Sequence, residues 1–220
     1  MRIYLHLTPN TEPVPFNYQR ALVGTFHRWL GENELHDDIS LYSLSWLQGG
    51  RTMKDGISFP EGATFFISSP LPELNQTLVT GILDAGHVRW GMHVKEATIA
   101  PAPKFGTEER FVAQSPILIK RKRPNGDGQQ YYFPGDEMAD TYLTETLHAK
   151  LIRAGLDTAG VTVRFDENYT SPKTKLVSYR DLKIKATFCP VIITGSPEAI
   201  AFAWQVGVGN STGIGFGALR

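Results

Sequence analysis

The sequence predicts an α+β protein made of two tandem ferredoxin-like (RRM-like) domains. Strand-like and helix-like segments follow the order β-α-β-β-α-β in the first hundred residues, and the same order recurs in the second half. An Ala-Pro-Ala-Pro sequence separates the two halves. The chain has 220 residues, 41% of them hydrophobic and 20% charged, which is typical of globular proteins and sufficient for two cores. The predicted division is a domain over 1–100, a linker over 101–110 and a domain over 111–220.

In the first half, apolar residues at helical spacing predict a helix over 17–33. They are Leu22, Phe26, Trp29 and Leu30. The remaining expected elements are strands over 2–8, 39–47, 57–69 and 88–99 and a second helix over 72–85, which Gly86 ends.

In the second half, a strand pair is expected within 111–133, turning at 124–128, followed by a helix over 137–154. Further strands are expected near 161–167 and 174–192, the latter broken. Ser196 and Pro197 predict the start of a last helix that runs through Trp204, since a capping hydroxyl and an early proline favour a helix start. A glycine-rich loop and a short terminal strand complete the chain.

Charge is balanced overall but unevenly distributed. The 22 basic and 22 acidic residues cancel, yet 1–110 carries a net charge of −3 and 111–220 a net charge of +3. Basic residues gather at 120–123 and within 171–185, where they could contact phosphates or simply form solvated surface. Because strand residues alternate between faces, at most two of the residues 120–123 can face one RNA.

Several classes of protein are excluded or disfavoured. The single Cys189 excludes a disulfide framework and a multi-cysteine zinc site. The sequence has no apolar run long enough for a membrane span and no signal-peptide core, so we expect a cytoplasmic protein without a membrane partner. No His/Asp/Glu spacing suggests a metal site, and we expect no cofactor.

The C-terminal glycine loop is the most informative segment. Five glycines, Gly207, Gly209, Gly213, Gly215 and Gly217, alternate in part with apolar residues. Successive N–H groups in such a loop can cradle phosphate oxygens. The order helix-loop-strand is the reverse of a dinucleotide fingerprint, and a P-loop lysine is missing. The alternatives are an exposed loop that binds RNA and a structural turn.

This loop, at the end of a duplicated ferredoxin-like chain, resembles the repeat-associated RNA-processing superfamily of CRISPR systems. Within it, the chain is similar to the endoribonucleases that cut precursor CRISPR RNA within each repeat. The helix over 18–30, the segment Leu35-His36-Asp37 with the following 40–45, and Ser115-Pro116 also resemble that family.

The resemblance implies metal-independent cleavage by the ribose 2′-hydroxyl, leaving a 2′,3′-cyclic phosphate and a 5′-hydroxyl. His36 matches the catalytic histidine of the family, and His27 matches a position where relatives carry an active-site tyrosine or histidine. Histidine suits both acid and base roles because its pKa lies near neutrality. Ser40 stands where some relatives have a charge-stabilising lysine. Tyr42 is the candidate that we assign to this role, and Ser43, Arg51 and Lys54 are alternatives.

The expected partner is CRISPR repeat RNA, with subunits of a CRISPR effector complex as a second class, and the expected state is a monomer or weak dimer. The expected RNA contacts are the five loop glycines together with Lys120, Lys122, Lys173, Lys175, Arg180 and Lys183. Two other functions compete: a catalytically silent RNA-binding subunit on the same fold, and a small-molecule-binding regulator. The histidines favour the enzyme, while the glycine loop and the basic second half argue against the regulator.

Overall fold

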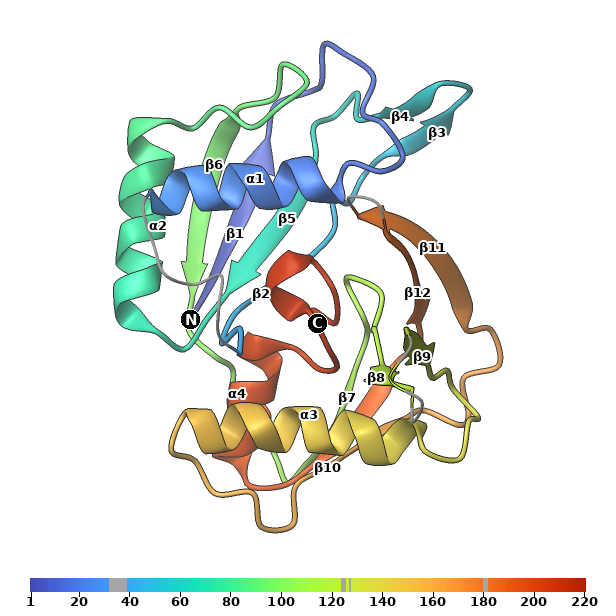
Figure 1. Ribbon diagram of the computed structural model, residues 1–220. Coiled ribbons are helices and arrows are strands. Elements are labelled where there is room, and N and C mark those ends of the chain that lie inside the picture. The colour runs from blue at the N-terminus through green and yellow to red at the C-terminus, as the bar shows by residue number, and fades with distance from the viewer. Residues whose placement is uncertain (32–38, 124–125, 127, 180–181) are drawn as a thin grey trace.

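The computed structural model describes residues 1–31, 39–123, 126, 128–179 and 182–220. Each half of the chain forms an antiparallel sheet with two helices, and the glycine loop lies between the halves (Figure 1). The predicted fold class, α+β with two tandem ferredoxin-like units, is confirmed.

The first half forms a four-stranded antiparallel sheet in the order β2-β5-β1-β6, against which α1 and α2 pack. In the chain, the hairpin β3–β4 is inserted between β2 and β5. The elements are β1 (Arg2–Leu7), α1 (Gln19–Leu30), β2 (Ser43–Leu44), β3 (Arg51–Met53), β4 (Gly56–Ser58), β5 (Thr64–Ser68), α2 (Pro72–Asp84) and β6 (Val94–Ala100).

The second half repeats this topology. Its sheet has the order β10-β13-β7, and the chain end adds a fourth position, because Val112 and Arg220 exchange two backbone hydrogen bonds of 2.7 and 2.8 Å. Two hairpins, β8–β9 and β11–β12, project from this half. The elements are β7 (Glu108–Phe111), β8 (Lys120–Lys122), β9 (Gln129–Tyr131), α3 (Ala139–Arg153), β10 (Thr162–Phe165), β11 (Lys173–Tyr179), β12 (Leu182–Phe188), β13 (Val191–Thr194), α4 (Pro197–Val206) and the short 3₁₀ helix η1 (Thr212–Ile214).

Two local predictions are confirmed by the helices. The apolar stripe predicted for the first helix is buried along its full length, from Leu22 to Leu30. Ser196 caps α4, since its hydroxyl accepts a hydrogen bond of 3.1 Å from the Ala199 N–H, and Pro197 occupies the first turn.

Four strand predictions are wrong in extent. The segment 39–47 forms a strand only at Ser43–Leu44. The segment 57–69 is divided between β4 and β5, because β4 turns back on β3 in a hairpin. The segment 88–99 becomes a strand only from Val94, since Trp90 and Gly91 both have positive φ and form a turn. The segment 174–192 contains three strands rather than one broken strand. β7 begins at Glu108, inside the expected linker, and the domain division over 101–110 stays a prediction.

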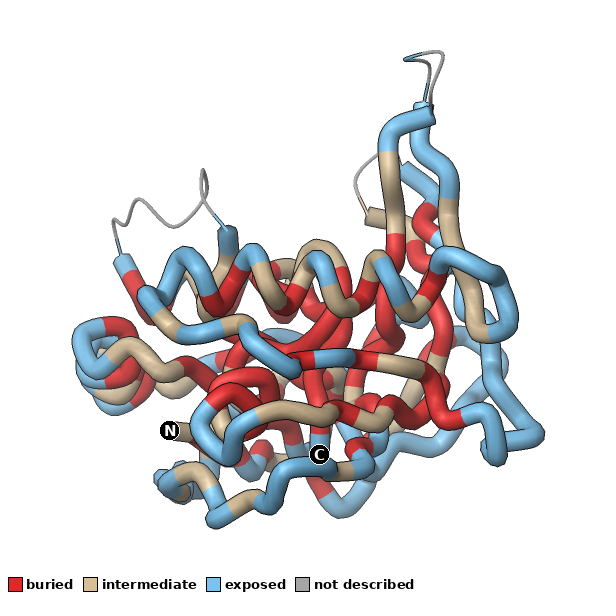
Figure 2. The backbone as a smooth tube through the Cα atoms, turned by 90° about the horizontal axis from the view of Figure 1, so that it is seen from below, coloured by how far each residue is buried: buried red, intermediate tan, exposed pale blue. Residues whose placement is uncertain are grey.

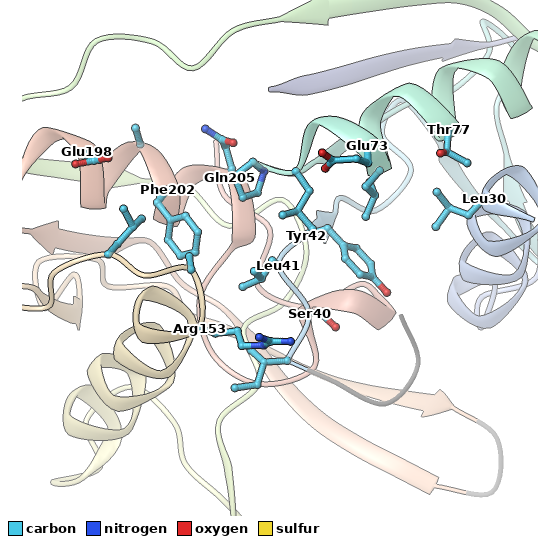
Figure 3. Close-up of a pocket in the computed structure, with 17 residues that line it drawn as sticks. Leu30, Ser40, Leu41, Tyr42, Glu73, Thr77, Arg153, Glu198, Phe202 and Gln205 are labelled. Carbon is cyan, nitrogen blue, oxygen red and sulfur yellow. The ribbon is translucent and has the colours of Figure 1, made fainter. Parts of the chain in front are cut away.

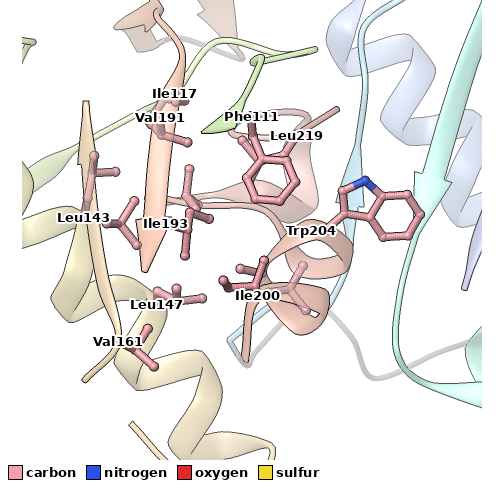
Figure 4. Close-up of a cluster of buried hydrophobic side chains, with 14 of the residues drawn as sticks. Phe111, Ile117, Leu143, Leu147, Val161, Val191, Ile193, Ile200, Trp204 and Leu219 are labelled. Carbon is pink, nitrogen blue, oxygen red and sulfur yellow. The ribbon is translucent and has the colours of Figure 1, made fainter. Parts of the chain in front are cut away.

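Each half has its own hydrophobic core. The core of the second half joins α3 and α4 to its sheet through residues such as Leu143, Leu147 and Ile193 (Figure 4). A smaller cluster, with Leu118, Val177 and Phe216 among its members, lies beneath the β11–β12 hairpin and includes the glycine loop. The buried backbone accordingly runs through the interior of the molecule, with exposed segments around it (Figure 2).

A buried arginine joins the two halves. The Arg2 guanidinium lies 3.7 Å from the ring centroid of Phe66 on β5 and 3.5 Å from that of Trp204 on α4. It also donates a 2.7 Å hydrogen bond to the Trp204 carbonyl oxygen. Burial lowers its pKa to about 10, so the side chain stays charged at neutral pH. Stacking a desolvated guanidinium between two rings is a favourable cation–π arrangement, and it fixes α4 against the first sheet.

We expect Arg2→Ala to lower the free energy of unfolding by about 2–4 kcal/mol, because it removes both ring contacts and leaves a cavity between the halves. Arg20→Ala, on the exposed side of α1, is the matched control and should change stability by less than about 0.5 kcal/mol. Chemical denaturation measures both. Equal stability of the two variants would contradict a clamping role for Arg2.

Candidate functional site

The glycine loop, 207–217, begins where α4 ends and lies against the first half. Its short helix η1 packs on α1 and β2. Trp46 of the first half donates from Nε1 to the Gly215 oxygen of the loop at 2.8 Å, and Ser43 donates to the Gln205 oxygen in the last turn of α4 at 2.8 Å. The loop is therefore a contact between the halves as well as a connection within the second.

Most loop glycines are explained by contacts within the protein. Gly207, Gly209 and Gly217 have positive φ, and a Cβ at any of them would meet a backbone carbonyl oxygen. That oxygen belongs to Gly217, Leu118 and Val208 respectively. The expectation of an exposed loop is wrong, since all five glycines are buried. The apolar side chains of the loop pack in the hydrophobic cores. The glycines keep the backbone of the loop narrow enough to pass between these cores. The RNA contacts expected of these glycines stay a prediction.

Gly213 differs from the others because it faces side chains of the first half. A Cβ at this position would collide with the Ser40 hydroxyl and lie 2.8 Å from the Tyr42 hydroxyl. The loop thus approaches two of the polar residues that sequence analysis singled out. Glycine at 213 lets the loop backbone come close to them.

Tyr42 is a buried phenol, with 3% of its surface exposed, at the contact between α1 and the glycine loop. Its ring lies 4.9 Å from that of Phe26 on α1. Burial raises the pKa of Tyr42, a hydrogen bond with Ser40 opposes that rise, and nearby Tyr179 adds to it. At neutral pH the hydroxyl is therefore protonated and can donate a hydrogen bond.

His27 lies on α1, half-buried, with its ring 5.1 Å from that of Phe26. Phe26 thus contacts both His27 and Tyr42, and of these two residues Tyr42 lies against the loop at Gly213. His36 lies outside the described residues. The residues after it that are described, Ile39 and Ser40, line the cavities beside the loop.

Three cavities follow one another, two at the junction of the halves and the third within the second half. The first has a volume of about 1030 Å³ and is mostly apolar; Tyr42 lines it together with residues of α1, α2, α3 and α4 (Figure 3). The second, of about 430 Å³, shares Ile39 and Ser40 with the first and follows the glycine loop.

The third cavity, of about 450 Å³, shares Thr146, Ala149 and Asn210 with the second and ends at Lys120 and Lys122. We call the second and third cavities together the α3 groove. It connects Ser40 with the basic β8–β9 hairpin.

The β8–β9 hairpin presents two lysines on one face. Lys120 and Lys122 share a face because strand residues alternate, and Arg121 lines the third cavity together with them. There Arg121 forms a 2.8 Å ion pair with Glu145 and stacks 4.3 Å from the Tyr142 ring. That at most two of the residues 120–123 face one RNA stays a prediction. The Lys120 N–H donates to Asn210 Oδ1 at 2.8 Å, which attaches the hairpin to the glycine loop.

The basic residues of the β11–β12 hairpin do not form one surface. In its register, Lys173 and Lys175 lie on the face of Val177, whereas Lys183 and Lys185 lie on the opposite face. All four side chains are exposed. Arg180 lies outside the described residues. One RNA strand on one face of this hairpin would contact two of these lysines.

Sequence analysis missed Lys150, a buried lysine behind the glycine loop. Its ammonium donates to the Val206 oxygen at 3.0 Å, the Gly207 oxygen at 3.1 Å and the Thr212 hydroxyl at 3.0 Å. Burial lowers its pKa to about 7. A signal was present, because Lys150 occupies a position on the apolar stripe of α3 that Leu143 and Leu147 begin.

The described part of the chain contains no group of three or more His, Cys, Asp or Glu side chains placed to hold a metal ion. Its helices are too short or too polar to cross a membrane.

Known proteins share both halves of this architecture. Residues 100–220 match the family described as CRISPR associated protein Cas6, C-terminal. The chain is 26% identical over 234 positions to the CRISPR-associated endoribonuclease Cas6 1 of Methanocaldococcus jannaschii, covering 99% of this chain and 91% of that protein. Since the family match includes more than half of its residues, the chain belongs to the Cas6 family of CRISPR-associated proteins.

Solved structures share the fold along the whole chain. A CRISPR associated protein Cas6 superposes with a TM-score of 0.83 at 23% identity, covering 100% of this chain and 98% of the other. The product of a Cas6-related gene from Pyrococcus furiosus superposes with a TM-score of 0.87 at 20% identity, covering 100% and 97%. At these identities the likeness establishes the fold.

We expect Gly217→Ala to destabilise the protein far more than Gly155→Ala. Both glycines have left-handed φ, +63° and +71°, but a Cβ meets the Val208 backbone only at 217, and nothing lies within 4 Å at 155. The strain of φ should cost about 1 kcal/mol at each site, and the clash about 2–3 kcal/mol more at 217. Denaturant unfolding compares them. Similar losses of stability in the two variants would contradict this expectation and show that the loop relaxes around a side chain.

Lys150 should make stability depend on pH. Lysine ordinarily titrates near 10.5, and in the folded protein the pKa is about 7. Between these values the unfolded chain binds more protons, so the free energy of unfolding should rise with pH. Relative to Lys150→Met, the wild type should gain up to about 5 kcal/mol between pH ~7 and ~10.5. Denaturant unfolding across this range measures it, and parallel curves for the two proteins would contradict it.

Proposed function

We propose that this protein is an endoribonuclease that binds CRISPR repeat RNA and cleaves precursor CRISPR RNA within the repeat. Membership of the Cas6 family supports this, as does the name of the Methanocaldococcus relative, an endoribonuclease. The observation that carries most weight is local. Tyr42 of the first half and Gly213 of the glycine loop meet at Ser40, which lines the groove that leads to Lys120 and Lys122. His27 contacts Phe26, the ring that packs against Tyr42.

The proposed reaction uses the RNA itself as the nucleophile. The 2′-oxygen attacks the adjacent phosphorus, a 2′-O–P bond forms, and the bond to the 5′-oxygen breaks. A base takes the 2′-proton and an acid protonates the leaving oxygen, so the products are a 2′,3′-cyclic phosphate and a 5′-hydroxyl. This chemistry requires no metal ion, and we propose that the protein needs none.

We assign the proton transfers to His27 and His36 and charge stabilisation to Tyr42. A histidine pair can supply one neutral base and one protonated acid near pH 7. Tyr42 stays protonated because burial raises its pKa, so it is suited to donate a hydrogen bond to phosphate oxygen and unsuited to act as a base. Its location near Gly213 places this donor beside loop backbone.

The α3 groove is the proposed path of the bound strand. Its lining includes the polar side chains of Ser40, Thr146 and Asn210, and it ends at Lys120 and Lys122. The first cavity is less suited to a phosphate backbone because its lining has two carboxylates, Glu73 and Glu198, and one basic residue, Arg153. We further propose that the protein acts in the cytoplasm as a monomer or weak dimer, and that effector-complex subunits are additional partners.

Cleavage of labelled repeat RNA in EDTA tests the proposal. We expect one cut in the repeat, and substituting hydrogen for the 2′-hydroxyl upstream of that cut should abolish cleavage while leaving binding nearly unchanged. A requirement for added Mg²⁺ would contradict the mechanism. Tight binding without any cut would instead identify the silent RNA-binding subunit.

We expect His27→Ala and His36→Ala each to slow single-turnover cleavage by about 10² to 10⁴, the usual contribution of a general acid or base. Repeat binding should change little. His93→Ala is the control, because His93 is exposed beside His87 on the turn before β6. Wild-type rates in both active-site variants would refute the assignment and direct attention to Tyr42.

A further inference from the structure

Lys150 approaches the glycine loop from the side opposite the first half. It lies in the last turn of α3, and its three donors meet three acceptors: the Val206 and Gly207 oxygens and the Thr212 hydroxyl. Both carbonyl groups belong to the C-terminal end of α4, where backbone oxygens lack partners within the helix and carry partial negative charge. One ammonium therefore fixes the beginning of the loop and its short helix together.

The part of the loop fixed in this way is the part that reaches the first half. Thr212 immediately precedes Gly213, whose Cα faces the Ser40 and Tyr42 hydroxyls. Two residues further on, the Gly215 oxygen accepts the hydrogen bond from Trp46. A shift of Thr212 would move both contacts, because Gly215 also donates its N–H to the Thr212 oxygen at 3.1 Å.

We propose that Lys150 is a positioning residue that holds the glycine loop against Ser40 and Tyr42, and so sets the geometry of the RNA site without touching RNA. Its side chain borders the second cavity, but all three of its donors are used by acceptors within the chain, so none is left for a phosphate oxygen. The expected effect of Lys150 on cleavage depends on the proposed function. The positioning of the loop by Lys150 depends on the structure alone.

Trp46 provides a readout that requires no RNA. The indole N–H resonance of Trp46 reports its bond to Gly215, and the variant Trp46→Phe identifies that resonance among the four tryptophans. Lys150→Met keeps the length of the side chain and removes all three donors. We expect it to shift or broaden the Trp46 resonance and to lower single-turnover cleavage at saturating protein at least tenfold.

Leu147→Ala is the matched control, since Leu147 is fully buried one turn earlier on the same helix and packs in the core of the second half. It should lower the melting temperature and leave the Trp46 resonance and the rate at saturation unchanged. An equal loss of rate in Leu147→Ala at a similar melting temperature would overturn the proposal, because general destabilisation would then explain the effect.

If Lys150→Met does not fold, a second pair of variants tests whether Lys150 positions the glycine loop. Thr212→Val is isosteric and removes one acceptor, and Thr212→Ser keeps the hydroxyl. We expect Thr212→Val to change the Trp46 resonance and the rate in the same direction as Lys150→Met, and Thr212→Ser to restore both. Wild-type behaviour of Thr212→Val, or of a folded Lys150→Met, would overturn the proposal. If the wild type itself cuts no repeat RNA, the proposed function fails, while the Trp46 resonance still decides the positioning role.

Discussion

The close approach of two backbone segments within the glycine loop determines how the chain ends. The Val208 N–H donates to the Gly217 oxygen at 3.0 Å, while the Val208 oxygen lies where a Cβ of residue 217 would be. This contact returns the chain after α4, so that the last three residues pair with 112–114 and complete the second sheet. The second sheet, the contact between the halves and the α3 groove all depend on a segment whose backbone leaves no room for a Cβ at Gly207, Gly209 or Gly217.

The order of elements could be predicted from sequence because hydrophobic periodicity and local caps report on it directly. The apolar stripe of α1 and the Ser196 cap of α4 act within a few residues, and the structure has them where the sequence places them. Strand boundaries were harder, since β4 and β5 are equally strand-like in composition and differ only in their partners. Pairing is a long-range property, and a run such as 57–69 does not show which of its residues turn back on β3.

The candidate site shows the same contrast between local features, which the sequence predicts, and long-range contacts, which it does not. The residue types at His27, Tyr42 and the loop were accessible to sequence reasoning, whereas their convergence depends on how the two halves pack. The loop was expected to be exposed because glycines and a chain end usually are. Its burial follows from tertiary contacts with Leu118 and Trp46, which no local pattern reveals. Lys150 was missed for a related reason: a lysine is ordinarily solvent-facing, and its three acceptors lie more than fifty residues away.

The sandwich of Arg2 between Phe66 and Trp204 has a consequence for the thermodynamics of association. A guanidinium held between rings from both halves, together with the bonds from Ser43 to the end of α4 and from Trp46 to the glycine loop, leaves little freedom for one half to rotate on the other. The junction is thus preorganised, and a ligand that binds along it does not have to order the protein. The entropic cost of forming a complex then falls on the ligand, and a strand that is already constrained would bind more tightly than a flexible one of the same composition.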